Sequence, residues 1–389
     1  MKELIVIGLN SGTSLDGVDA AICLINFTGK PKINFLNGLV LPYETIFKKK
    51  LQAVLTSNTI NLKDLCLINA QLGDYFLEAT LKVIKETNLT TNDINLIGSH
   101  GQTFWHSPNP ILYFNKPTCG SLQLGDPSII AQKTKIPVVC DFRVQDICAH
   151  GQGAPLVAYL DKILFGNDNI ATGILNIGGI ANITFINSSN NVELAFDTGP
   201  GNMIIDHAAK LLFQLDFDQD GVIASKATYD QNSLNTLMQH NYFSKNPPKT
   251  TGREEFGYTY ANSVINFLEH QSLDKETIMS TITAFTAYSI AQAYENFIKP
   301  HENIERLIVA GGGAYNKTLI AQLQNFITPK TTIKMHDEYS IPVKYKEAIL
   351  FALLAYTRYY NLANNIPKVT GAINPVSMGK IINPNYSLN

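Results

Sequence analysis

One layout occurs twice in this chain: an apolar run, a turn rich in glycine and small polar residues, and a second apolar run. Residues 4–7 and 20–25 flank the first turn, and residues 173–177 and 180–185 flank the second. Apolar runs of this length bounded by glycine are typical of paired β-strands. The two copies share the layout without sharing residues, so we interpret them as two lobes built on one architecture.

The segments that follow each copy alternate between helical and strand patterns, which indicates an α/β fold. We place the joint near residue 165, which gives an N-terminal lobe of residues 1–165 and a C-terminal lobe of residues 166–365. The tail, residues 366–389, is expected to return to the first lobe. Two α/β lobes leave a cleft between them, which is the usual place for a ligand.

The composition favours a large buried core and argues against several kinds of partner. Of the 389 residues, 45% are hydrophobic and 16% are charged, so extensive disorder is not expected. The net charge of −2 and the lack of a long basic run argue against nucleic acid as a partner. We find no signal-peptide pattern and no apolar segment of the about 18 residues that a membrane-spanning helix needs. Five dispersed cysteines without a CxxC pair fit reduced thiols, so we expect a cytoplasmic protein.

The first turn, residues 8–19, has the chemistry of a phosphate and metal site. Its glycines let backbone N–H groups approach an anion closely, and its hydroxyl groups add further donors. The carboxylates of Asp16 and Asp19 could hold Mg²⁺ directly or through water. An ordinary hairpin with a glycine-rich turn explains the same residues equally well, because short glycine-rich loops are weak signals.

Three more glycine-containing turns follow predicted strands, at residues 178–182, 197–202 and 311–316. Backbone donors from such turns in opposing lobes could clamp a triphosphate, since phosphoryl transfer needs mainly positioning and charge stabilisation. Asp197 follows a strand and precedes Thr-Gly-Pro-Gly, so it is a candidate general base or metal-linked carboxylate. The alternative is an Asx-turn, in which the carboxylate bonds its own backbone.

Candidate sugar contacts come after a predicted buried strand at residues 94–98. Functional groups of α/β sheets gather at the carboxyl ends of strands. His100 lies there, and His106 follows the only tryptophan, Trp105. An indole face can pack on a pyranose ring while imidazoles bond its hydroxyl groups. The alternative is that all three are partly buried packing groups.

Two charged residues further along are candidate substrate contacts. Arg143 follows a predicted strand and could bind a substrate carboxylate with two hydrogen bonds. A structural ion pair of Arg143 with Asp141 or Asp146 is the alternative. Glu347 begins an amphipathic helix, where a carboxylate also interacts favourably with the helix N-terminus. At each position, the sequence is compatible with a substrate contact and with a purely structural interaction.

Ten stretches of the chain carry a family resemblance. They are GLNSGTSLDGVDA, GSHGQTFWHSP, LQLGDPSIIA, CDFRVQD, GQGAPLVAYLD, LNIGGIANIT, FDTGPGNMIID, VAGGGAYN, KEAILFALLA and VTGAINPVSMGKI. In these motifs and their order, the chain resembles the anhydro-N-acetylmuramic acid kinases of the sugar kinase–Hsp70–actin superfamily. The motifs span nearly the whole chain, and together they are far more specific than any single turn.

The resemblance implies a two-lobed, actin-like (ribonuclease H-like) ATPase fold with ATP and Mg²⁺ in a central cleft. It implies a double reaction on 1,6-anhydro-N-acetylmuramic acid in the recycling of cell-wall sugars. Water opens the anhydro ring at C1, and the released O6 takes the γ-phosphoryl group of ATP. The product is N-acetylmuramic acid 6-phosphate. The resemblance also suggests a homodimer.

The matching motifs imply roles for particular residues. Asp197, in FDTGPGN, would be the base that activates the water, and Asp16 would be the metal ligand of the first turn. His100, Arg143 and Glu347 are the expected sugar contacts. The residues expected to bind ATP are Gly12, Thr13, Ser14, Leu15, Asp16, Gly17, Val18 and Asp19 in the first phosphate loop, Gly178, Gly179 and Gly199 in the turns of the second lobe, and Gly311, Gly312 and Gly313 on the adenosine side.

Three positions depart from the family pattern. Asn10 stands where Met is common, His150 where Gly is common, and Ala158 where Pro is frequent. None of them is the expected base, but they keep a related substrate open. Two other functions therefore remain as alternatives: a kinase of an ordinary amino-sugar hydroxyl group, and a non-catalytic ATP-binding regulator of the same superfamily.

Overall fold

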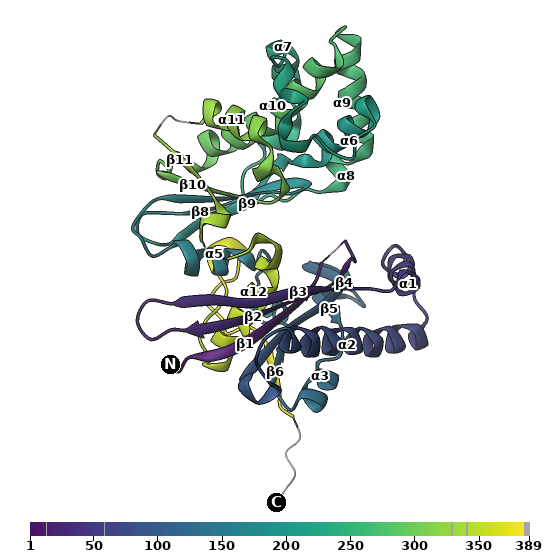
Figure 1. Cartoon of the computed structure of the whole chain (residues 1–389), viewed down its shortest axis with the longest axis vertical. Helices are drawn as coiled ribbons and strands as arrows, with labels where there is room; N and C mark the ends of the chain where they lie inside the picture. Colours follow the sequence, from purple (N-terminus) through teal and green to yellow (C-terminus); the bar gives the residue numbers. More distant parts are fainter. Residues whose placement is uncertain (13, 58, 328–329, 340, 385–389) are drawn as a thin grey trace, which may run out of the picture. The chain divides into compact units, whose positions relative to one another are not determined.

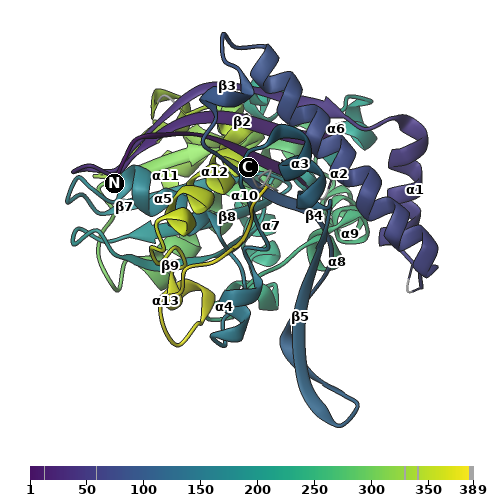
Figure 2. The same ribbon diagram turned by 90° about the horizontal axis from the view of Figure 1, so that it is seen from below.

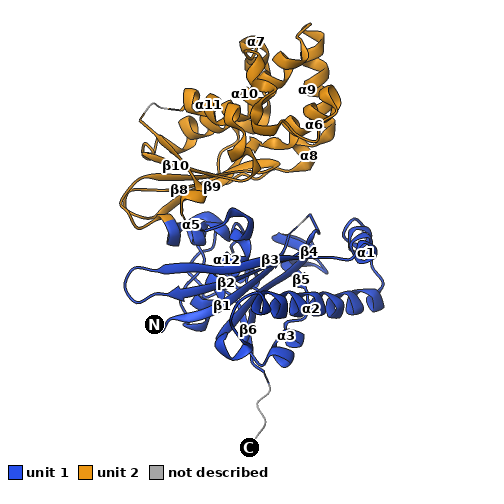
Figure 3. Ribbon diagram, viewed as in Figure 1, with its two compact units in different colours: residues 1–164, 340–389 blue, residues 165–339 orange. Residues whose placement is uncertain are grey.

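The chain divides into two compact units, which are shown together in Figure 1 and coloured separately in Figure 3. The computed structural model describes residues 1–12, 14–57, 59–327, 330–339 and 341–384. Unit 1 consists of Met1–Leu164 together with Ser340–Asn389, and unit 2 is Phe165–Tyr339. The sequence pattern placed residues 166–365 in the second lobe. That assignment was wrong for residues 341–365, which belong to unit 1.

Unit 1 is built on a seven-stranded sheet. Its strands are β1 (Leu4–Ser11), β2 (Gly17–Asn26), β3 (Lys32–Pro42), β4 (Leu96–Tyr113), β5 (Lys116–Leu124), β6 (Val138–Cys140) and β12 (Lys380–Ile382). They lie in the order β12-β6-β4-β1-β2-β3, and β5 pairs with β4. The strands β1, β2 and β3 pair in antiparallel fashion, whereas β4 runs parallel to both β1 and β6.

Helices cover both faces of this sheet. They are α1 (Thr45–Leu55), α2 (Leu62–Lys85), α3 (Pro127–Thr134), α4 (Val144–Cys148), α5 (Val157–Phe165), α12 (Lys346–Tyr359) and α13 (Pro367–Thr370). One face of α2 is apolar and shares a core with alternate side chains of β1 and β2, among them Ile7, Leu9 and Ile22. The residues between these on β1 face the other way, towards α12, which contacts β1, β2 and β4.

The helix α12 approaches the sheet closely because two strands carry glycine where it crosses. A Cβ atom added at Gly8 of β1 would overlap the carbonyl oxygen of Ala348, and one at Gly98 of β4 would overlap that of Phe351. This packing places α12 in unit 1. The sequence of the helix shows that it is buried but does not show which sheet it covers, and this is why the lobe assignment failed there.

Unit 2 contains a five-stranded sheet with the order β11-β10-β7-β8-β9. Its strands are β7 (Thr172–Ile177), β8 (Ile180–Ile186), β9 (Val192–Pro200), β10 (Arg306–Ala310) and β11 (Thr332–Met335). The strands β7, β8 and β9 are antiparallel neighbours, and β10 is parallel to β7 and β11. The order and directions equal those of β6-β4-β1-β2-β3 in unit 1. The repeated sequence layout is therefore a repeated ribonuclease H-like sheet, and the expected α/β fold class is confirmed.

The helices of unit 2 surround one long central helix. They are α6 (Asn202–Phe213), α7 (Gln231–Leu237), α8 (Arg253–Phe256), α9 (Tyr258–His270), α10 (Lys275–Ala293) and α11 (Lys317–Phe326). The helix α10 is buried on nearly all sides and packs against α6, α11 and β9, as expected of a core helix. The sequence predicted one helix over residues 276–298, and its last turn is a π-helix, Tyr294–Ile298.

A long hairpin of β4 and β5 projects from unit 1, as Figure 2 shows. The sequence predicted a buried strand over residues 94–98, with functional groups following its carboxyl end. Instead β4 continues to Tyr113, and its pairing with β5 holds the whole segment extended. Trp105 lies on this hairpin with 63% of its surface exposed.

Replacing Gly98 by Ala is expected to lower the melting temperature, because the added methyl group would push α12 away from β4. Overpacking of this kind costs about 1–3 kcal/mol. Gly120→Ala in β5 is the matched control, since an added Cβ there meets nothing within 4 Å. Thermal unfolding followed by circular dichroism measures both variants. Equal melting temperatures would contradict the close packing of α12.

Candidate functional site

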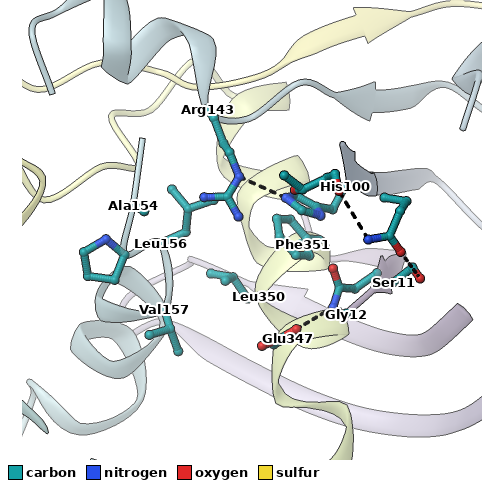
Figure 4. A pocket seen from close by; sticks show the side chains of 14 residues that line it. Ser11, Gly12, His100, Arg143, Ala154, Leu156, Val157, Glu347, Leu350 and Phe351 are labelled. Atoms are coloured by element: carbon teal, nitrogen blue, oxygen red, sulfur yellow. Dashed lines mark hydrogen bonds between the residues drawn. The ribbon is translucent and has the colours of Figure 1, made fainter. Parts of the chain in front are cut away.

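A cavity of about 280 Å³ lies in unit 1 beside the end of β1 and the first half of β4 (Figure 4). Its lining comes from β1, β4, the start of α4, the segment that leads into α5, and the first half of α12. The residues are Asn10, Ser11, Gly12, His100, Gln102, Thr103, Arg143, Ala154, Pro155, Leu156, Val157, Glu347, Leu350 and Phe351. The three expected sugar contacts His100, Arg143 and Glu347 therefore border one cavity.

Arg143 and His100 are held together at this cavity. Arg143 Nε donates to His100 Nε2 at 3.1 Å, and Arg143 Nη1 donates to the Gly153 carbonyl oxygen at 2.7 Å. Since His100 Nε2 accepts, its Nδ1 carries the hydrogen and donates to the Gly101 carbonyl oxygen at 3.0 Å. The imidazole also stacks on Phe351, with ring centroids 4.4 Å apart. These contacts hold His100 as a neutral imidazole in one orientation.

The electrostatics of the pair agree with this arrangement. Burial and the charge of Arg143 lower the pKa of His100 to about 3. Burial lowers the pKa of Arg143 to about 10, and the negative charge of Glu347 acts in the opposite direction. At neutral pH the pair is thus a neutral imidazole and a cationic guanidinium that points into the cavity (Figure 4). A fixed cation of this kind suits a carboxylate ligand.

The structural partners considered for Arg143 are engaged elsewhere. Asp141 forms an ion pair with Lys380, and the buried Asp146 accepts a hydrogen bond from the Thr370 hydroxyl group. The guanidinium is therefore held by an imidazole and a carbonyl oxygen, which leave its charge available to a ligand.

Polar side chains at the end of β1 are joined to other elements. Asn10 Nδ2 donates to Glu347 Oε2 at the start of α12. Ser11 Oγ donates to Gln102 Oε1 at 2.6 Å and accepts from the Tyr43 hydroxyl group at 2.9 Å. Asn10 and Gln102 are not among the site residues predicted from the sequence. Their positions inside the motifs GLNSGTSLDGVDA and GSHGQTFWHSP are the only sequence signal that points to them.

The two acids of the first turn have different surroundings. Asp16 is exposed and pairs with Lys48 at 2.6 Å, which lowers the pKa of Asp16. Asp19 lies opposite Asn10, and burial, with the charge of Glu347, raises its pKa to about 6. Among the described residues, no group of three or more His, Cys, Asp or Glu side chains could hold a metal ion.

The other residues predicted for the first phosphate loop are placed as follows. Thr13 lies outside the described residues. Leu15 and Val18 point their side chains into the core of unit 1, so only their backbones could contact a ligand. Gly12 lines the cavity and accepts a hydrogen bond from the Leu15 N–H at 3.2 Å, which closes the turn. Ser14 is exposed.

In unit 2 the predicted glycine turn of residues 178–179 meets the start of α6. The N–H of Asn202 donates to the Gly178 carbonyl oxygen at 2.7 Å, and that of Gly201 donates to the Gly179 carbonyl oxygen at 2.9 Å. A Cβ at Gly201 would overlap the Gly178 carbonyl oxygen. The N–H groups at the start of α6 are therefore hydrogen-bonded to the turn. They fix the conformation of the turn and are not free to bind an anion.

The predicted adenosine-side turn follows β10, the neighbour of β7. Gly311 has φ = 83°, a left-handed conformation that favours glycine. A Cβ at Gly311 would overlap the Ile177 carbonyl oxygen, and one at Gly313 would clash with the side chains of Ile177 and Asn202, so this turn packs directly against the end of β7. The turn borders a second cavity, of about 430 Å³. Its lining is Asn202, Ile205, Asp206, Phe217, Asp218, Gln219, Asp220, Gly312, Tyr315 and Asn316.

Asp197 lies near the end of β9 and pairs with Asn182 of β8, at the sheet edge where Gly199 opposes Ala181. Its Oδ2 accepts a hydrogen bond from the Thr251 N–H at 2.9 Å. The partner lies 54 positions along the chain, so this is not an Asx-turn. Burial raises the pKa of Asp197, and the bond from Thr251 lowers it. A half-buried carboxylate with one oxygen held by the backbone is suited to accept a proton.

The remaining sugar candidates do not line the cavity. Trp105 and His106 lie on the projecting hairpin, where His106 Nδ1 is 3.0 Å from Ser121 Oγ. The sequence placed them beside His100 because they are close along the chain. The extended backbone of β4 leaves Trp105 exposed, whereas burial and the charge of nearby Arg143 lower the pKa of His106.

Two ribonuclease H-like units with glycine turns and a positioned carboxylate are the features of an actin-like kinase. The sequence profile of the family described as anhydro-N-acetylmuramic acid kinase matches residues 4–384. The chain is 41% identical over 385 residues to the anhydro-N-acetylmuramic acid kinase of Caldanaerobacter subterraneus subsp. tengcongensis, covering 98% of this chain and 97% of that protein. It is 40% identical over 383 residues to the Bacillus cereus protein of that name, covering 97% and 99%. The chain belongs to the anhydro-N-acetylmuramic acid kinase family.

The low pKa of His100 makes the stability of the protein depend on pH. The ordinary pKa is 6.5 and the folded value is about 3, so the unfolded chain binds more protons between these values. The free energy of unfolding should therefore fall as the pH falls from 6.5 towards 3. In His100→Gln, urea unfolding at stepped pH should show a shallower fall, with the exposed His301→Gln as control. An equal slope in wild type and His100→Gln would show that His100 titrates normally when folded.

Proposed function

We propose that this protein transfers the γ-phosphoryl group of ATP to O6 of 1,6-anhydro-N-acetylmuramic acid while water opens the anhydro ring at C1. The product is N-acetylmuramic acid 6-phosphate, a step in the recycling of cell-wall sugars. The observation that carries the proposal is the family match over residues 4–384, with relatives of that name at 41% and 40% identity.

Asp197 is the proposed general base. Its carboxylate takes a proton from the attacking water, the water oxygen bonds C1, and the C1–O6 bond breaks. The electron pair of that bond remains on O6, which bonds the γ-phosphorus of ATP while the bond from the γ-phosphorus to the bridging oxygen breaks and ADP leaves. The Thr251 N–H binds Oδ2, so Oδ1 is the oxygen proposed to take the proton. General-base catalysis of this kind contributes about 10²–10⁴-fold.

The cavity of unit 1 is the proposed sugar site. The substrate carries a lactyl carboxylate, and Arg143 offers a cation held in place by His100. The Glu347 carboxylate, fixed by Asn10, is proposed to accept a hydrogen bond from a sugar hydroxyl group. Leu350 and Phe351 give the cavity an apolar wall for the ring.

ATP and Mg²⁺ are the proposed cofactors. The first loop, residues 12–19, and the turns that contain Gly178, Gly179, Gly199 and Gly311 to Gly313 are proposed to bind the nucleotide. Support comes from the family match over residues 4–384, and from Gly12 and Gly312, which border the cavities of units 1 and 2 with no side chain to block approach to their backbone. Asp16, together with Asp19 of the same loop, is proposed to hold the metal ion directly or through water. When bound, Mg²⁺ neutralises phosphate charge.

We also propose a homodimer in the cytoplasm, without nucleic acid or membrane as a partner. The homodimer follows from the family resemblance. No helix in the described part of the chain is long and apolar enough to cross a membrane. All five cysteines are free thiols, which agrees with a reducing compartment.

An ADP-release assay with purified protein, ATP and Mg²⁺ tests the proposed reaction. It compares 1,6-anhydro-N-acetylmuramic acid, N-acetylmuramic acid and no sugar, with product masses measured. We expect ADP release only with the anhydro sugar, and a product heavier by one phosphate and one water. Phosphorylation of the free sugar alone would favour an ordinary sugar kinase, and sugar-independent ADP release would favour the regulator.

Asp197→Asn should lower kcat by about 10²- to 10⁴-fold, because the amide cannot take the proton from water. The fold and ATP binding, measured by thermal unfolding and calorimetry, should be retained. Asp216→Asn, an exposed acid in the same unit, is the control and should keep full activity. Near-normal turnover of Asp197→Asn would remove Asp197 from the base role.

Arg143→Gln should lower kcat/KM for 1,6-anhydro-N-acetylmuramic acid by about 10- to 100-fold, the loss expected of one charged hydrogen-bonded contact. The analogue 1,6-anhydro-N-acetylglucosamine has no lactyl carboxylate, so kcat/KM for this sugar should change much less. Steady-state kinetics of both sugars with both proteins measure the difference. An equal loss for the two sugars would contradict a contact between Arg143 and the carboxylate.

A further inference from the structure

Lys249 is a buried lysine that the proposed reaction does not use. It is 7% exposed, although lysine is rarely buried. Its ammonium group donates to the carbonyl oxygens of Tyr242 at 3.3 Å and Phe243 at 3.5 Å. It also lies 4.5 Å from the ring centroid of Phe297 and 4.8 Å from that of Tyr242. A buried charge is costly unless such contacts offset its desolvation, so this position indicates a specific role.

The segment that contains Lys249 holds Asp197 at three points. The Asp197 N–H donates to the Lys249 carbonyl oxygen at 3.1 Å. The Asp197 carbonyl oxygen accepts from the Tyr242 hydroxyl group at 2.7 Å, and the carboxylate Oδ2 accepts from the Thr251 N–H at 2.9 Å. Residues 242–251, which we term the clamp, therefore hold both the main chain and the side chain of Asp197.

The Lys249 side chain joins the two ends of the clamp. Its ammonium group binds the carbonyl oxygens of residues 242 and 243 at one end, while its own carbonyl oxygen binds Asp197 near the other. The ammonium group also lies 5.8 Å from the ring centroid of Phe196, the residue before Asp197. Removing it would release the contacts that keep the Thr251 N–H directed at the carboxylate.

We infer that Lys249 is a positioning residue for Asp197: its buried ammonium group closes the clamp and thereby fixes the direction of the Asp197 carboxylate. The inference rests on the proposed role of Asp197 as general base. It deepens that role by naming the group that holds the base in place, since a misplacement of about 1 Å can cost 10²-fold in rate.

Several titratable groups lie near Asp197 and the clamp, and they determine how the pKa of Asp197 should change when the clamp loosens. They are Tyr242, Lys245, Lys249, Glu254 and Glu255. Burial and the charge of Glu254 raise the pKa of Asp197, whereas the Thr251 bond lowers it. Lys245 pairs with Glu255, which accepts a hydrogen bond from the Thr251 hydroxyl group. Loosening the clamp removes the bond that favours the charged carboxylate, so the pKa of Asp197 should rise.

Lys249→Met tests the inference, because Met keeps the apolar stem and lacks the ammonium group. We expect kcat to fall by about 10- to 100-fold, with little change in KM for either substrate. The acid limb of the kcat–pH profile should move to higher pH, which a merely structural residue would not cause. Lys210→Met, at an exposed lysine of α6, is the control and should keep the wild-type rate and profile.

A folded Lys249→Met protein with wild-type kcat and an unmoved acid limb would overturn the inference. If Lys249→Met does not fold, Lys249→Gln takes its place, because an amide N–H can still donate to the carbonyl oxygens. The Gln variant should have a smaller loss in the same direction, and a wild-type profile would overturn the inference again. Asp197→Asn separates the two proposals: normal turnover there would refute the base role itself, whatever Lys249 does.

Discussion

The close contact of α12 with the sheet is the constraint on which the site of unit 1 depends. Gly8 and Gly98 present no side chain where the helix crosses, so the helix backbone lies directly against the strands. The same helix brings Glu347 to the end of β1 and places Phe351 under the ring of His100. Protein interiors are packed too densely to absorb an extra methyl group there. The two glycines, which have no side chain, thus determine where the helix and its functional groups lie.

Unit 2 uses a related arrangement on a sheet of the same strand order. Its first strand ends in a glycine turn, and Gly201 at the start of α6 meets that turn at backbone distance. The turn after β10 packs against the end of β7 in the same way. In both units, close packing of the backbone requires glycine at these positions, whether or not a ligand binds there. This explains why a single glycine-rich turn is a weak functional signal, whereas a repeated set of them defines a fold.

The candidate functional groups are held in place by the protein itself. A neutral His100 and a carbonyl oxygen hold Arg143, and the Thr251 N–H holds the carboxylate of Asp197. Groups fixed in this way need little reorganisation when charge develops during a reaction. Burial lowers the pKa values of His100 and Arg143 and raises that of Asp197, while the hydrogen bond from the Thr251 N–H opposes the effect of burial at Asp197. The groups that hold Arg143 and Asp197 therefore define the site as much as the two charged residues do.

The sequence by itself determined what depends on local pattern: the strands and glycine turns, the repeated α/β unit, the family, and the three candidate residues that border the cavity of unit 1. It did not predict that residues 341–365 belong to unit 1 or that Asp16 pairs with Lys48. It also did not predict that β4 extends to Tyr113 and carries Trp105 along the projecting hairpin. These three features are set by the tertiary structure alone. The tertiary structure also brings the Lys249 carbonyl oxygen to the Asp197 N–H. The physical reason is that strand and turn formation follow from neighbouring residues, whereas contacts between distant residues depend on how the elements pack.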